Sequence, residues 1–247
     1  MTDTALVTRE QNSLTIPEHL KGSVGGRLGR ENVEKDDVLI PRLSVAQEGM
    51  SPQMKKKNEN YNPDLEDGDI FDSLSGEIYG KEVTVIPLFF FKNFIKFRPQ
   101  AEGGGVLAQY SSKSEVPMQE LAWVDGVKPA TTEFKNRMCI INSKNGIKPI
   151  VVSFKSSSIK CAKKWEYLIG ETNMDAFARA YHLRSITMTR GEQSWNGLDV
   201  RAGDFVPAEF YKAAKDYFTQ LQEGGFKVDT SGLEGAEENQ DAEAPGG

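Results

Sequence analysis

Residues 87–99, PLFFFKNFIKFRP, carry the side chains best suited to binding a ligand. If this segment is a strand, its side chains alternate between two faces. One face is mostly apolar and should be buried: Phe89, Phe91, Asn93, Ile95 and Phe97. The other face interleaves aromatic rings with cations: Phe90, Lys92, Phe94, Lys96 and Arg98. Aromatic rings stack on unpaired bases and cations neutralise phosphates, so this face predicts binding of a single-stranded nucleic acid.

The same segment has a second interpretation. A strand with lysines on its outer face is also typical of an ordinary amphipathic strand, in which the charges prevent edge-to-edge aggregation. On this segment alone the ordinary amphipathic strand is favoured, so the rest of the chain has to shift the balance towards binding.

A second cationic cluster lies in the segment SIKCAKKWEYLI, which is predicted to be helical. Lys160, Lys163 and Lys164 are spaced at i, i+3 and i+4, so they share one face of that helix. Lys155 lies just before it, at the end of a predicted strand. The serines at 156–158 either cap the helix or help its first turn to hold a phosphate oxygen. The cluster is either a solvated helix face or a further contact for nucleic acid.

Arg190 and Trp195 belong to a predicted hairpin, TMTRGEQSWNGLDV. A tryptophan beside a hairpin turn either stacks on a base from a mobile loop or closes the end of a barrel. Both residues are therefore candidates for the same binding surface.

The charge of the chain is unevenly distributed. The whole chain has 30 Lys and Arg, 36 Asp and Glu, and a net charge of −6. Residues 229–247 hold six acidic residues and no Lys or Arg, so the other 228 residues sum to zero. We expect a disordered acidic tail that competes with nucleic acid for a basic groove, or that recruits replication or recombination proteins.

The domain organisation follows from composition. Residues 1–35 are rich in glycine and charge and predict a flexible arm; residues 36–228 predict a single domain; residues 229–247 form the tail. Cys139 and Cys161 are the only cysteines and are not spaced as a CxxC pair, which indicates reduced thiols and a cytoplasmic protein. No apolar run is long enough to span a membrane, no secretory signal is visible, and no cofactor or metal is predicted.

The pattern of short strands and hairpin turns predicts a mainly β (α+β) fold, an OB-like small β-barrel decorated with two or three helices. The predicted strands are residues 68–74, 77–79, 83–97, 121–124, 137–142, 149–154, 183–190 and 194–201. The predicted hairpin turns are residues 125–126, 145–146 and 191–193, and the predicted helices are residues 156–169, 173–182 and 207–223.

Two other functional classes remain open. Asp64, Glu66, Asp67 and Asp69 form an acidic cluster that suits Mg²⁺ in a nuclease, although a solvated loop has the same composition. The chain contains no GxSxG, HExxH or P-loop motif. The third class is an interaction or assembly protein that binds no nucleic acid.

The order of several segments resembles the OB-fold single-stranded DNA-binding proteins of bacteriophages. These are LIPRLSVAQEGMSPQ, GDIFDSLSGEIYGKEVTVIPLFF and PIVVSFKSSSIKCAKKW, followed by a polar hairpin, a closing helix and an acidic end. The resemblance implies a non-catalytic protein of the host cytoplasm that coats single strands in phage DNA replication and recombination. It also implies that the basic strand and residues 155–164 line the groove. The chain ends AEAPGG, without the aromatic residue on which such tails often dock, so only charge competition carries over.

Overall fold

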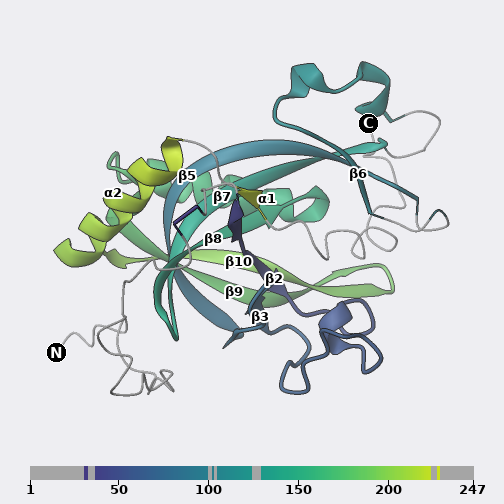
Figure 1. Cartoon of the computed structure of the whole chain (residues 1–247), viewed down its shortest axis with the longest axis horizontal. Coiled ribbons are helices and arrows are strands. Elements are labelled where there is room, and N and C mark those ends of the chain that lie inside the picture. Colours follow the sequence, from purple (N-terminus) through teal and green to yellow (C-terminus); the bar gives the residue numbers. More distant parts are fainter. Residues whose placement is uncertain are drawn as a thin grey trace.

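Long antiparallel strands dominate the computed structural model, which describes residues 31–32, 37–99, 102, 105–123, 129–223 and 227–228 (Figure 1). The strands are β1 (Leu39–Ile40), β2 (Arg42–Val45), β3 (Ile70–Asp72), β4 (Ile78–Gly80), β5 (Glu82–Phe97), β6 (Val106–Tyr110), β7 (Thr131–Ser143), β8 (Gly146–Phe154), β9 (Arg179–Arg190), β10 (Gln193–Phe205) and β11 (Lys227–Val228). The helices are α1 (Ile159–Gly170) and α2 (Ala208–Gln222). Single 3₁₀ turns lie at Pro52–Met54, Lys113–Glu115, Met118–Glu120, Ser156–Ser158 and Ala176–Ala178.

Nine of the described strands form one curled sheet in the order β10-β9-β5-β7-β8-β2-β3-β4, with β6 also paired to β5. Strand β5 is its centre, because β9 pairs with its first residues, β6 with its last, and β7 runs beside most of its length. Strand β2 is parallel to β8, whereas the other pairs of this sheet are antiparallel. The chain therefore folds as a mainly β protein with a half-barrel sheet and two α-helices.

The curled sheet has a core on each side. Val85, Cys139 and Trp165 belong to the inner core, which α1 closes. Leu88 and Met138 belong to the outer core, against which α2 packs. Alternate residues of β5 and β7 point to opposite cores, as expected for strands that are buried on both faces. A bulge between Pro87 and Phe89 shifts the alternation of β5 just before its basic segment.

Side-chain hydrogen bonds join the segment just after β2 to β10, which is an edge strand of the curled sheet. The Gln47 side chain, just after β2, donates to the Asn196 carbonyl of β10 at 2.5 Å and accepts from the Asn196 N–H at 2.8 Å. The Asn196 side chain donates to the Ala46 carbonyl at 3.2 Å. Gln47 thus mimics a backbone ladder between the end of β2 and β10. These bonds fix the β9–β10 hairpin against the start of the domain.

Most of the predicted elements are confirmed. The hairpins around residues 145–146 and 191–193, the long strand β5 and both main helices lie where the sequence patterns predicted them. Residues 173–182 were expected to be helical, and this prediction is wrong. Only Ala176–Ala178 makes a helical turn, and β9 begins at Arg179, because Tyr181 pairs with Val85 and joins the inner core.

The region between β5 and β7 also differs from the prediction. Residues 121–123 form no strand, whereas the preceding polar insert contains an unpredicted strand, β6. The predicted turn at 125–126, the tail at 229–247 and almost all of the arm at 1–35 lie outside the described residues. Among the helices that the structure describes, none is long and apolar enough to cross a membrane.

Candidate nucleic-acid interface

Phe90 is the exposed aromatic ring of the basic strand face. Its side chain is 38 % exposed, and the Arg137 guanidinium lies 5.5 Å from its ring centroid. The two residues are opposite each other in the β5–β7 register, so they share a face of the sheet. Arg137 is buried, and burial lowers the pKa of its guanidinium. The pair forms a fixed aromatic–cation step at the surface.

Lys92 extends this step along β5. It is exposed and lies opposite Lys135 in the register. Its ammonium is 3.0 Å from the Glu133 carboxylate of β7. Lys92 is thus on the predicted face, but an acidic neighbour partly neutralises it.

The far end of this face is covered, which corrects the prediction for Phe94. Phe94 is only 3 % exposed, because here β5 runs between β6 and β7. Lys96 is half-buried and donates to Glu120 at 2.8 Å, and Glu120 also accepts from the Thr131 hydroxyl at 2.8 Å. The bond raises the pKa of Lys96 and lowers that of Glu120. Arg98 is exposed beyond the strand end. In this structure Phe94 therefore presents no open ring for stacking.

Helix α1, which carries the second lysine cluster, contacts the Phe90 end of the strand face through one ion pair. Arg137 forms an ion pair with Glu166 of α1, and Lys163 is one turn earlier on the same helix side. Lys160 and Lys163 are exposed, whereas Lys164 donates to Asp199 of β10 at 2.6 Å. Burial alone would raise the pKa of Asp199, but the bond from Lys164 keeps it below its ordinary value. The helix that carries the lysine cluster is thus joined to the strand face by the Arg137–Glu166 pair, while Lys164 is bonded to β10.

Lys155 points away from this surface. Its ammonium lies 5.9 Å from the Phe97 ring centroid and 5.7 Å from that of Phe134, on the opposite face of the sheet. Its backbone N–H donates to the Ser158 hydroxyl, which donates back to the Lys155 carbonyl. Ser156 has a φ of 45°, which turns the chain from β8 towards α1. The expected continuous surface of Lys155 with the other α1 lysines is therefore not formed.

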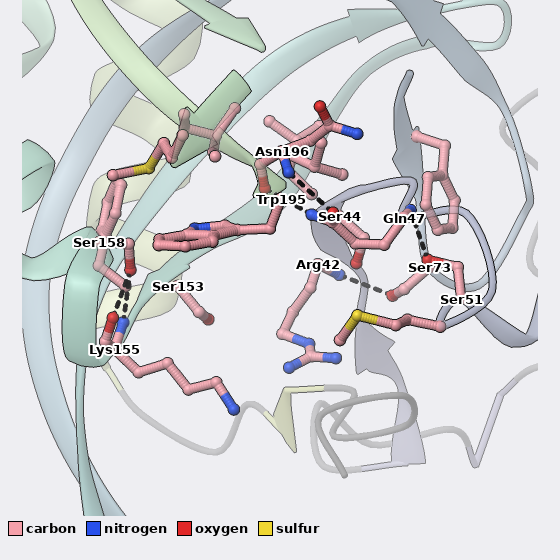
Figure 2. Close-up of a pocket in the computed structure, with 18 of the residues that line it drawn as sticks. Arg42, Ser44, Gln47, Ser51, Ser73, Ser153, Lys155, Ser158, Trp195 and Asn196 are labelled. Atoms are coloured by element: carbon pink, nitrogen blue, oxygen red, sulfur yellow. Dashed lines mark hydrogen bonds between the residues drawn. The ribbon is translucent and has the colours of Figure 1, made fainter. Parts of the chain in front are cut away.

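Lys155 and Trp195 instead line a cavity between β2, the start of α1 and the β9–β10 hairpin (Figure 2). Its volume is about 200 Å³. Arg42, only 5 % exposed, is a further cation of its lining. Six serines also contribute: Ser44, Ser51, Ser73, Ser153, Ser157 and Ser158. Arg190 is the last residue of β9 and pairs with Gln193 in this hairpin, but its side chain is not among those that the structure describes.

Arg42 and Arg137 were missed by the sequence reasoning. Each is a single arginine inside a run of core residues, in LIPRLSV and NRMCII. A buried arginine requires a hydrogen-bonding or charged partner, so an arginine within an apolar strand pattern is itself a signal of a functional site.

The two cysteines and the acidic loop, the other candidates for chemistry, do not form a reactive site in the described residues. Cys139 and Cys161 are free and lie in the inner core. Burial raises the pKa of both thiols, that of Cys161 to about 12, so both stay protonated at neutral pH. In the acidic loop, Asp67 accepts the Glu48 N–H at 2.7 Å. In the part of the chain that the structure describes, no three His, Cys, Asp or Glu side chains gather as a metal site.

Comparison with known proteins identifies the family. The model of the Pam3 phage gp34-like protein family matches residues 9–227, which include the whole of the curled sheet. The chain belongs to the Pam3 phage gp34-like protein family. The family is named for a phage protein, which supports the phage origin implied by the sequence resemblance. No curated protein and no solved structure matches the chain.

Proposed function

We propose that this Pam3 phage gp34-like protein is a non-catalytic single-stranded DNA-binding protein with an OB-like barrel. It acts in phage DNA replication or recombination. The single strand lies along the Phe90 end of the β5–β7 face and the neighbouring side of α1. A base stacks on the Phe90 ring, and Lys92, Lys160 and Lys163 neutralise phosphates.

The observation that carries the proposal is the position of Phe90. It is an exposed ring on a central strand, supported by the Arg137 guanidinium and flanked by an exposed lysine. Arg137 also forms an ion pair with Glu166 of α1, the helix that bears the exposed Lys160 and Lys163. An aromatic ring with cations on two sides is the arrangement that sequence-tolerant binding of single strands requires.

The acidic tail has a defined starting point in this proposal. Strand β11 pairs in parallel with β1, with Val228 opposite Ile40, two residues before Arg42. Val228 is the last described residue before the tail, and its partner Ile40 precedes Arg42 by roughly 7 Å of extended chain. A segment with six acidic residues that starts there competes with DNA at a high effective concentration.

The proposal is tested by fluorescence anisotropy with labelled oligo(dT) of roughly 20 nucleotides, longer than the ~4–16 that one OB fold covers. We expect saturable binding at low ionic strength and much weaker binding of a duplex of the same length. Absence of binding by both the full chain and a chain ending at Val228 would contradict the proposal.

Incubation of the same oligonucleotide with the protein and Mg²⁺ separates binding from catalysis. A non-catalytic protein leaves the oligonucleotide intact on a denaturing gel. Protein-dependent cleavage that EDTA abolishes would replace the proposal with the nuclease hypothesis.

A further inference from the structure

We infer that the cavity between β2, the start of α1 and the β9–β10 hairpin binds one nucleotide unit of a single strand. The base lies against the Trp195 indole, and the phosphate lies beside Arg42 and Lys155. The inference rests on the proposed function and adds to it an anchoring site that is separate from the Phe90 surface.

Trp195 provides the aromatic wall. It is half-buried, lines the cavity, and belongs to neither hydrophobic core of the described residues. Figure 2 shows its indole extending into the cavity towards Ser158. Trp165, by contrast, is 1 % exposed and packs against Phe154 and Tyr181 at centroid distances of 6.1 and 5.8 Å. Trp195 thus presents a ring to the cavity, whereas Trp165 has a structural role.

Arg42 and Lys155 provide the wall for an anion. They come from opposite sides of the cavity and extend on the same side of the indole in Figure 2. The 21 described residues of the lining include these two cations and no Asp or Glu. A guanidinium binds two phosphate oxygens at once, while an ammonium adds a point charge. This composition selects an anionic ligand over a neutral or cationic one.

Hydroxyl and amide groups complete the recognition surface. Ser44, Ser153 and Ser157 of the lining offer donors to phosphate oxygens. Gln53 offers a donor and an acceptor for the edge of a base, whereas the Gln47 and Asn196 side chains are engaged in holding the walls. A base in a duplex is stacked and paired, so only an unpaired base can enter such a cavity.

The size of the cavity limits the ligand. Its volume of about 200 Å³ is below the ~300–1,000 Å³ of sites for drug-sized molecules. The space is therefore suited to a single base with its phosphate rather than to a dinucleotide cofactor.

The walls are held rigid before any ligand binds. The paired bonds between Gln47 and Asn196 fix the hairpin that carries Trp195. The Arg42 N–H donates to the Ser73 hydroxyl at 2.9 Å, and Ser158 caps the turn that carries Lys155. A pre-organised site loses less conformational entropy on binding.

Tryptophan fluorescence of the full chain tests the inference. We expect dTMP to quench the emission saturably and to bind at least fivefold more tightly than thymidine or inorganic phosphate alone. In Trp195→Phe the quenching should disappear. In Trp123→Phe it should persist, because Trp123 is a partly exposed tryptophan outside the cavity lining. Equal affinity for dTMP and thymidine, or quenching that survives Trp195→Phe, would overturn the inference.

Lys155→Gln is a second variant that leaves the indole intact. We expect it to weaken dTMP binding at least fivefold while leaving thymidine binding unchanged. Thermal unfolding of each variant confirms that it is folded. Unchanged dTMP binding in the folded Lys155→Gln protein would overturn the phosphate assignment.

Oligo(dT) with and without a 5′-phosphate distinguishes the source of the nucleotide. Tighter binding of the phosphorylated strand indicates that the cavity holds a strand end, and equal binding indicates an internal nucleotide. If oligo(dT) binds but no cavity variant changes its affinity or dTMP quenching, the inference fails and the proposed function stands. If dTMP binds as expected but oligo(dT) does not bind, the proposed function fails and the cavity remains a nucleotide site.

Discussion

The strand face and the cavity use the same residue types but differ in the acidic residues that the structure describes beside them. On and beside the strand face, Lys92 lies 3.0 Å from Glu133 and Lys164 lies 2.6 Å from Asp199. The described lining of the cavity contains Arg42 and Lys155 and no carboxylate. DNA on the strand face must therefore compete with these carboxylates, whereas the described lining residues of the cavity contribute none. Because some lysines are paired with carboxylates, the number of lysines in a sequence segment overstates the positive charge that its surface offers to DNA.

Two phenylalanine–arginine pairs provide a built-in control for the strand face. Arg137 lies 5.5 Å from the Phe90 ring centroid, and Arg179 lies 5.7 Å from that of Phe205. Phe205 is 61 % exposed, at the end of β10, and pairs in register with Arg179. Arg137 of the Phe90 pair is ion-paired to Glu166 of α1, whereas Arg179 of the Phe205 pair donates to the Gly203 carbonyl. Phe90 and Phe205 are thus both exposed rings with an arginine neighbour, and they differ in where they lie on the sheet.

Deletion of residues 229–247 should have the largest effect on either region. Removing six acidic residues that start near Arg42 should tighten oligo(dT) binding about tenfold at low salt, because the competing polyanion is lost. Anisotropy titrations of the two proteins measure this change. A control with the same tail length and its acids changed to Asn or Gln should match the deletion. Equal affinity of all three proteins would refute competition.

The next prediction separates the two phenylalanine pairs. Phe90→Leu should weaken oligo(dT) binding roughly tenfold, within the range that loss of one base stack produces. Phe205→Leu should leave the affinity unchanged, although it removes a more exposed ring. Both affinities are measured by anisotropy at the same salt concentration. Equal losses in both variants would show that the strand face has no special role.

Much of the fold could be predicted because its turns and strands are marked by short-range sequence signals. Turn residues such as Asn145 and Gly191 and the alternation along β5 are short-range signals, and they placed the two main hairpins correctly. The helix predicted for residues 173–182 is wrong because pairing of Tyr181 and His182 with β5 outweighs a weak helical pattern. Strand β6 was missed because it lies in a polar insert and forms only by pairing with the end of β5.

The candidate site was only partly predictable, because its geometry depends on contacts between distant segments. Phe90 and Lys92 were placed correctly on one face, but nothing near Phe94 in sequence shows that it becomes buried. Lys155 was grouped with the α1 lysines, yet the turn at Ser156 directs it into a different cavity. Long-range packing decided both outcomes.

A smaller effect should come from the carboxylate that opposes Lys92. Glu133→Gln should tighten oligo(dT) binding about two- to threefold at low salt, since a partly exposed ion pair is worth at most about 1 kcal/mol. Glu209→Gln is the matched control, because it removes one negative charge from exposed α2. Tightening by both variants alike would indicate a general effect of net charge rather than release of Lys92.

The smallest effect concerns the covered end of the strand face. The pKa of Glu120 is lowered by Lys96, so their interaction stabilises the fold above the ordinary glutamate pKa of about 4.3 and is lost as pH falls through the lowered value. Glu120→Gln should therefore lower the Tm at pH 7 slightly and leave it unchanged at low acid pH. Thermal unfolding across pH measures the difference. A Tm difference that persists in acid would contradict this account.

Photo-crosslinking tests the central claim most directly, because it reports which residues touch the strand. Full-length protein is bound to a single strand carrying 5-iododeoxyuridine, irradiated, digested and mapped by mass spectrometry. We expect adducts on the peptides that contain Phe90 and Trp195, and none on the peptide that contains Phe205. Adducts at Phe205 alone, or no adduct at either predicted ring under saturating conditions, would contradict it.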